Sequence, residues 1–264
     1  MKAVILARGL GTRMRRPAEG AELNERQREA AATGVKGMMP IGADRPFLDY
    51  VMNALADGGV DQVGLVIGPE HSIVRDYYAS LPTTRITIGF AVQEEPRGTA
   101  DAVLSAAEWV GDDRFLMLNS DNYYPVEAVR GLVQLPGSGI AAFRRDALIA
   151  LGGIPRERVG RFPVVRWDAE HHLTALEDPG EVDDPDPAIS MNLWCFTARI
   201  FEACRKIKRS PNGEFEIQVA VRYARDVLEE PFRVLDFSLP VLDITSRADV
   251  AAVGRRLSEV EVRL

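Results

Sequence analysis

The first half of the chain alternates short apolar, β-rich runs with helical stretches, and this alternation constrains the fold more than any other feature. The predicted strands are Ala3–Leu6, Gln62–Ile67, Ile86–Val92 and Phe115–Leu118, and the predicted helices are Phe47–Leu55, Ser72–Tyr78 and Ala100–Val110. Such alternation is typical of βαβ units. We therefore expect an α/β, three-layer, Rossmann-like fold, with a mixed but mostly parallel sheet and helices on both faces. In such sheets ligands bind beyond the carboxyl ends of the strands.

The second half is less regular. Its predicted strands are Ile140–Phe143, Phe162–Trp167, Ile189–Phe196 and Phe232–Phe237, and its predicted helices are Glu214–Val227 and Arg247–Leu257. Ser246 and Asp249, three residues apart, predict a capping box for the last helix. The acid- and proline-rich stretch Glu177–Pro187 predicts a surface loop, and polar Ala18–Thr33 predicts a short solvated helix or a mobile flap.

Composition limits the classes of partner. The chain has 264 residues, is 46% hydrophobic and carries a net charge of −7 without a basic block, which argues against nucleic acid or an anionic membrane as its main partner. No apolar run approaches the ~18–20 residues of a membrane span. The apolar start is too short for a signal peptide, so we expect a cytoplasmic protein. Cys195 and Cys204 are expected to be unpaired thiols.

The loop Gly9-Leu10-Gly11-Thr12-Arg13 directly follows the first predicted strand. Glycines let backbone amides approach a phosphate, and an arginine adds a charged fork, so this loop predicts a phosphate site. On its own the pattern equally fits a tight turn. Met14 stands where a dinucleotide fingerprint needs its third glycine, and no Gly-Lys-Ser/Thr follows as in a Walker loop.

Further polar residues lie at predicted strand ends. Lys36 precedes an apolar turn, Gln93 opens the segment Gln93–Val103 at the end of a strand, and Asp121 follows the strand Phe115–Leu118. An aspartate at such an edge is a common Mg²⁺ ligand, although it is also a common helix cap. No His/Cys cluster has zinc-ligand spacing, and Ser120 lacks the turn of a hydrolase nucleophile. The three histidines, His71, His171 and His172, are expected at the surface.

Together these motifs resemble the nucleotidyltransferase family that activates sugar phosphates, including thymidylyl-, uridylyl- and guanylyltransferases. The chain supplies the family's LA-[AG]-G-x-GTR-[LM] pattern at Leu6–Met14, then the lysine block, then Q-x-x-P-x-GTA-x-A at Gln93, then the aspartate at 121. Weaker likenesses follow at Glu177-Asp178-Pro179, Met191–Phe196, Ser210–Ile217 and Val241–Ile244. The resemblance covers nearly the whole chain.

The resemblance implies a GT-A-like single domain over 1–264, with a nucleotide-binding part at about 1–135 and an acceptor-binding part at about 136–264, and no C-terminal β-helix. It implies Mg²⁺-dependent transfer of a nucleotidyl group from a nucleoside triphosphate to a sugar or sugar-like 1-phosphate, giving a nucleoside diphosphate sugar and pyrophosphate. The partners would be those two small molecules, with no nucleic acid or membrane. The chain would be a monomer or a homodimer.

The resemblance also implies roles for individual residues. Arg13 and Lys36 would be catalytic, holding the triphosphate; Leu6, Ala7, Gly9, Leu10, Gly11, Thr12, Gln93, Gly98, Thr99 and Asn119 would bind the nucleotide; Asp121 and Asp243 would bind the metal; Glu177, Asn192 and Glu214 would bind the acceptor. A sugar 1-phosphate is already an anion near neutral pH, so the reaction needs alignment and charge neutralisation rather than a general base.

Departures from the family pattern leave the acceptor open. Arg8 adds a charge to the loop, 22 residues separate Arg13 from Lys36, and Asp178 replaces the lysine that contacts the sugar phosphate in relatives. A replacement cation would come from Lys206, Lys208, Arg144 or Arg145. Two alternatives therefore stay open: a cytidylyltransferase acting on a non-sugar phosphate, and a nucleotide-sugar sensor without turnover. The sequence does not identify the base.

Overall fold

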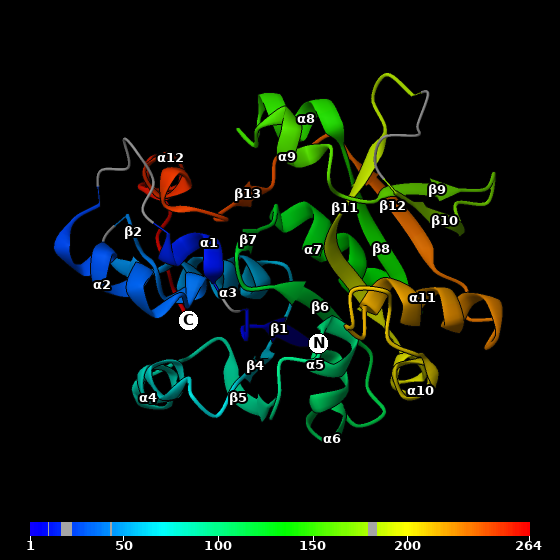
Figure 1. Cartoon of the computed structure of the whole chain (residues 1–264), viewed down its shortest axis with the longest axis horizontal. Coiled ribbons are helices and arrows are strands. Elements are labelled where there is room, and N and C mark those ends of the chain that lie inside the picture. Colours follow the sequence, from blue (N-terminus) through cyan, green and yellow to red (C-terminus); the bar gives the residue numbers. More distant parts are fainter. Residues whose placement is uncertain (10, 17–22, 43, 179–183) are drawn as a thin grey trace.

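A mixed sheet forms the centre of the protein. The computed structural model describes residues 1–9, 11–16, 23–42, 44–178 and 184–264. Within these residues the main sheet has nine strands, seven of them in the order β10-β9-β11-β6-β1-β4-β5, with β8 pairing β11 and β12 pairing β8 (Figure 1). β1 (Lys2–Leu6), β4 (Gln62–Ile67), β5 (Thr87–Val92) and β6 (Phe115–Asn119) are mutually parallel. This confirms the four strands predicted for the first half and the mostly parallel fold.

The strands of the second half extend the same sheet. They are β8 (Gly139–Arg144), β9 (Val164–Trp167), β10 (Leu173–Glu177), β11 (Ala188–Phe196) and β12 (Arg233–Phe237). β11 runs antiparallel to β6, with Trp194 opposite Met117, so it joins the two halves of the chain. The sequence did not predict β10, nor the two-residue strands β2 (Pro40–Ile41), β3 (Arg45–Pro46), β7 (Asn122–Tyr123) and β13 (Leu242–Asp243).

Helices cover both faces of the sheet because successive side chains of its central strands point to opposite sides. Val4 and Met117 belong to one hydrophobic cluster on the first face of the sheet. The helices that contribute to this cluster are α5 (Thr99–Ser105), α6 (Ala107–Val110), α10 (Arg199–Lys206) and α11 (Ile217–Asp226). Ile5 and Leu118 face the other, with α3 (Phe47–Asp57), α4 (Ser72–Ser80), α7 (Val126–Gln134) and α12 (Arg247–Leu257). The sequence missed α7 and α10.

Shorter elements complete the described chain. They are α1 (Thr12–Arg15), α2 (Glu25–Thr33), the 3-10 turn η1 (Lys36–Met38), α8 (Arg145–Ala150) and α9 (Arg156–Val159). α2 falls within the stretch predicted as a helix or flap, of which residues 18–22 lie outside the described residues. Of the predicted loop Glu177–Pro187, Glu177 instead ends β10, and residues 179–183 lie outside the described residues.

Three local predictions can be compared with the structure. The capping box of α12 is present, with Ser246 and Asp249 as its partners. Both cysteines are buried free thiols, as expected. The helix predicted over Ala100–Val110 is interrupted at Ala106, between α5 and α6. Among the described residues, no helix is both long and apolar enough to cross a bilayer.

The packing of Trp109 on the sheet gives a test of the fold. Gly64 and Gly89 are paired across β4 and β5, and a Cβ atom at Gly64 would lie 2.7 Å from the Trp109 ring. Replacing Gly64 by alanine should therefore lower the free energy of unfolding by about 2 kcal/mol through overpacking. Gly254→Ala in α12 is the control, since its Cβ atom would meet nothing within 4 Å. Urea denaturation showing the two variants equally stable would contradict this packing.

Candidate active site

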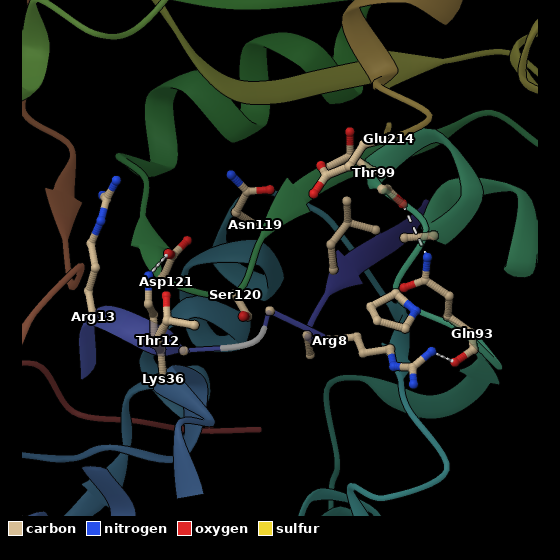
Figure 2. A pocket seen from close by; sticks show the side chains of 17 residues that line it. Arg8, Thr12, Arg13, Lys36, Gln93, Thr99, Asn119, Ser120, Asp121 and Glu214 are labelled. Carbon is tan, nitrogen blue, oxygen red and sulfur yellow. Dashed lines mark hydrogen bonds and ion pairs between the residues drawn. The ribbon is translucent and has the colours of Figure 1, made fainter. Parts of the chain in front are cut away.

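A cavity of about 440 Å³ opens at the carboxyl ends of β1 and β6 (Figure 2). It contains every predicted nucleotide-binding residue in the described part of the chain, together with both predicted catalytic residues. Its lining consists of Leu6, Ala7, Arg8, Gly9, Gly11, Thr12, Arg13, Lys36, Gln93, Pro96, Gly98, Thr99, Ala102, Asn119, Ser120, Asp121 and Glu214. Leu10 lies outside the described residues.

The glycine loop is shaped by close backbone packing. Gly11 has φ of 60°, in the left-handed region, and a Cβ atom there would lie 1.9 Å from the carbonyl oxygen of Gly34. Only glycine fits this position. The loop then enters α1, where Thr12 and Arg13 are exposed beside the cavity. The glycine therefore lets the loop turn against α2 and direct Arg13 toward the cavity.

One end of the cavity holds charged side chains. The Lys36 Nζ atom lies 2.8 Å from Asp121 Oδ2, and the two side chains are 20% and 22% exposed. Lys36 comes from η1 and Asp121 lies two residues after the end of β6, so residues 85 positions apart form this pair. Arg13 lies beside them in Figure 2 and has no ion-pair partner within the described residues. This end therefore presents two cations and one acid to a ligand.

The other end is built on Gln93 and Gly98. A Cβ atom at Gly98 would lie 2.5 Å from the carbonyl oxygen of Phe215, because the two backbones run against each other. Phe215 N–H donates to the Arg97 carbonyl and Ala100 N–H donates to the Phe215 carbonyl, both at 2.8 Å. This contact brings Glu214, from the second half of the chain, into the cavity.

Arg8 extends toward this second end, away from Arg13 and Lys36 (Figure 2). Its guanidinium donates to both Glu70 carboxylate oxygens at 3.2 Å and to the Gln93 carbonyl. A Cβ atom at Gly68 would lie 2.4 Å from Arg8 Nε, so the glycine makes room for this side chain. The extra charge noticed in the sequence is thus paired with Glu70 and supports the backbone of Gln93.

The second predicted metal ligand, Asp243, lies next to Asp121 but is not part of the cavity lining. Ile244 N–H donates to the Asp121 carbonyl at 2.9 Å, which ties the two segments together. Burial and, secondly, the negative charge of Asp121 raise the pKa of Asp243 to about 6. Its Oδ2 accepts from Arg158 Nη1 at 2.6 Å and from the Thr245 hydroxyl at 2.9 Å. The sequence did not indicate Arg158.

The carboxylate of Asp121 suits a magnesium ion that also binds substrate. The described residues contain no group of three His, Cys, Asp or Glu side chains able to hold a metal. Mg²⁺ usually keeps several waters and binds one or two carboxylates plus substrate phosphates, so a larger protein cage is not required. Asp121 faces the cavity and fits this role, whereas the carboxylate of Asp243 is already bound by Arg158.

Two of the three predicted acceptor-binding residues lie outside the cavity lining. Glu177 pairs with Arg166 at 2.8 Å, and the Asn192 amide oxygen accepts from Gln218 at 3.3 Å. Glu214 alone of the three lines the cavity, and Asp178 is exposed. None of the cations suggested as replacements for the family lysine, Lys206, Lys208, Arg144 and Arg145, is among the lining residues. Arg166 is the cation beside Glu177, and it was missed because β10 was not predicted.

Comparison with known proteins identifies the family and the fold. Residues 24–233 match the family model described as nucleotidyl transferase. The chain is 31% identical over 226 residues to a glucose-1-phosphate thymidylyltransferase of Streptomyces antibioticus, covering 86% of this chain but only 58% of that relative. It is 27% identical to a UTP–glucose-1-phosphate uridylyltransferase of Haloferax volcanii, covering 89% and 86% of the two chains. A UDP-glucose pyrophosphorylase complexed with UDP-glucose shares the fold, with a TM-score of 0.73, 18% identity and coverage of 98% and 99%.

The ion pair between Arg158 and Asp243 gives a test of the site's architecture. Arg158→Met leaves Asp243 buried without its cation and also removes the 3.0 Å ion pair of Arg158 with Asp249, so the free energy of unfolding should fall by about 3 kcal/mol. Arg161→Met is the control, since Arg161 is exposed and its side chain has no ion-pair partner in the described part of the chain. Adding Asp243→Asn to Arg158→Met should recover part of the loss in urea denaturation. A double variant less stable than Arg158→Met would contradict the pairing.

Proposed function

Because the chain belongs to the nucleotidyl transferase family, we propose that it transfers a nucleotidyl group from a nucleoside triphosphate to a sugar 1-phosphate. The products are a nucleoside diphosphate sugar and pyrophosphate. The observation that carries the proposal is one cavity with Arg13, Lys36 and Asp121 at one end and Gln93 and Gly98 at the other. The first end suits phosphates and a metal ion, and the second suits a base.

The cavity provides charge neutralisation rather than a nucleophile. Its described lining contains no histidine and no cysteine. In the proposed reaction an oxygen of the acceptor phosphate attacks the α-phosphorus, and the bond from that phosphorus to the pyrophosphate oxygen breaks. The acceptor is already an anion, so no proton must be removed. Arg13 and Lys36 offset the negative charges that this attack brings together.

Lys36 and Asp121 act as a unit in this proposal. Their 2.8 Å ion pair holds a phosphate-binding cation beside the carboxylate that would bind Mg²⁺. When bound, Mg²⁺ would supply positive charge to the reacting phosphates. The pair therefore orients the triphosphate before the acceptor arrives, which is the main contribution available to an enzyme of this kind.

The choice of a sugar 1-phosphate as acceptor rests on the relatives. The thymidylyltransferase and the uridylyltransferase are both named for glucose 1-phosphate. Glu214 lies in the cavity and would contact the acceptor, with Glu177 and Asn192 as more distant candidates. Asp178, which stands in place of the lysine in the Glu-Lys-Pro pattern of the family that the sequence resembles, favours a second candidate acceptor, a non-sugar phosphate such as an alcohol phosphate.

Pyrophosphate release tests the proposed function. Each of ATP, CTP, GTP, UTP and dTTP is combined with Mg²⁺ and either glucose 1-phosphate, other hexose 1-phosphates or alcohol phosphates. We expect release that depends on a hexose 1-phosphate. Release only with alcohol phosphates would support the second candidate. Nucleotide binding without release from any pair would contradict transfer and indicate a sensor.

Variants of the ion pair test its role in turnover. Lys36→Ala and Asp121→Asn should each lower kcat by about 100-fold or more, because each removes a group that neutralises or organises the phosphates. Arg161→Ala and Asp112→Asn are the control variants. Both control residues are exposed, and Asp112 precedes β6 at the end of the strand opposite Asp121. Near wild-type kcat in either site variant, with an unchanged circular dichroism spectrum, would contradict the assignment.

A further inference from the structure

Gln93 lies at the end of the cavity proposed to bind the nucleotide base, and its side-chain amide is held in one orientation. The residue is 3% exposed. Its Nε2 donates to Asp101 Oδ2 at 2.8 Å and to the Gly98 carbonyl at 3.1 Å. Within the described residues its Oε1 accepts no hydrogen bond, and Figure 2 shows this oxygen directed toward the cavity. Gln93 therefore presents a hydrogen-bond acceptor to the cavity and not a donor.

The backbone of Gln93 is fixed as well. Its N–H donates to the Ile67 carbonyl at 2.9 Å, and its carbonyl accepts from Arg8. Neither interaction involves the side-chain amide. Inversion of that amide is therefore the one local change by which this residue could present a donor to the cavity without moving its backbone.

Asp101 opposes this inversion. It lies on α5, its side chain is 11% exposed, and its Oδ1 pairs with Arg97 at 2.8 Å. A carboxylate accepts hydrogen bonds and donates none, so only the NH₂ group of Gln93 can face it favourably. The Gly98 carbonyl also accepts from this NH₂ group and so favours the same orientation. A hydrogen bond to an ionised acceptor is, however, about twice as strong as one to a neutral acceptor. Asp101 thus makes the larger contribution to the orientation.

We propose that Asp101 is a positioning residue that keeps the Gln93 oxygen toward the nucleotide and so selects uracil, thymine or guanine over cytosine and adenine. The inference rests on the proposed function, since it concerns the base of the transferred nucleotide. Uracil, thymine and guanine carry a ring N–H that donates to this oxygen. Cytosine and adenine carry a ring nitrogen acceptor at the same place, which would face the oxygen unpaired.

The orientation of the amide also limits the selectivity. A site that reads a base by one amide cannot discriminate by more than the free energy of inverting that amide, because the inverted form accepts the wrong base. Asp101→Ala removes the charged acceptor and leaves only the Gly98 carbonyl to hold the amide. The loss of this bond should reduce the selectivity about tenfold, chiefly through faster use of the disfavoured nucleotide.

The test compares kcat/KM for the preferred nucleotide and its amino counterpart at one acceptor: UTP with CTP, dTTP with dCTP, or GTP with ATP. We expect the wild type to prefer the first member of the pair. Asp101→Ala should lower the ratio about tenfold, and Asp101→Asn, which keeps the shape and a neutral acceptor, should lower it less. Glu108→Ala on α6 is the control, since Glu108 is exposed and lacks an ion-pair partner among the described residues.

Each outcome bears on the inference. A wild type that prefers CTP or ATP, or an unchanged ratio in Asp101→Ala, would overturn it. If Asp101→Ala does not fold, the ratio for Asp101→Asn decides. Absence of turnover with every nucleotide would count against the proposed function alone. The ratio of dissociation constants for the same nucleotide pairs, measured by calorimetry, would then test the selection of the base.

Discussion

The position of β6 in the sheet determines where the site can form. β1 pairs in parallel with β4 on one side and with β6 on the other, so the strand order reverses between β1 and β6. Chain connections leave a crevice at such a point in an α/β sheet. The segments that follow β1 and β6 supply the glycine loop and Asp121, and the cavity lies beyond these strand ends. The remaining functional side chains are positioned around this edge.

The cavity is organised by pairs of opposite charge contributed by segments far apart in the chain. Lys36 pairs with Asp121 at the end of the cavity that also holds Arg13. Arg158 pairs with Asp243 next to Asp121, and Arg8 pairs with Glu70 at the end that holds Gln93. Each pair holds a side chain in place before a ligand binds, so less ordering would be required in the proposed reaction. Arg13 has no ion-pair partner among the described residues, so a chain with a net charge of −7 can still present a free cation to the proposed anionic substrate.

Much of this structure could be predicted from the sequence, because hydrophobic periodicity and glycine motifs are local signals. The features predicted correctly are the parallel strands, the capping box at Ser246 and the gathering of four side chains at one edge of the sheet, those of Arg13, Lys36, Gln93 and Asp121. Arg158 and Arg166 could not be predicted, because each acquires its role from a partner on another element. Arg166 meets Glu177 only through the register of β9 with β10, and β10 has no strong strand pattern. The break at Ala106 likewise lies within a run of good helix formers.

The central claim is that the acceptor's phosphate attacks the nucleotide directly in this cavity. It is tested most directly by mass spectrometry of the products formed from a nucleoside triphosphate and a hexose 1-phosphate whose non-bridging phosphate oxygens carry ¹⁸O. The account predicts a nucleoside diphosphate sugar that retains all of the labelled oxygens and pyrophosphate that contains none. Label in the pyrophosphate, or a sugar phosphate recovered unchanged beside intact nucleotide, would contradict it.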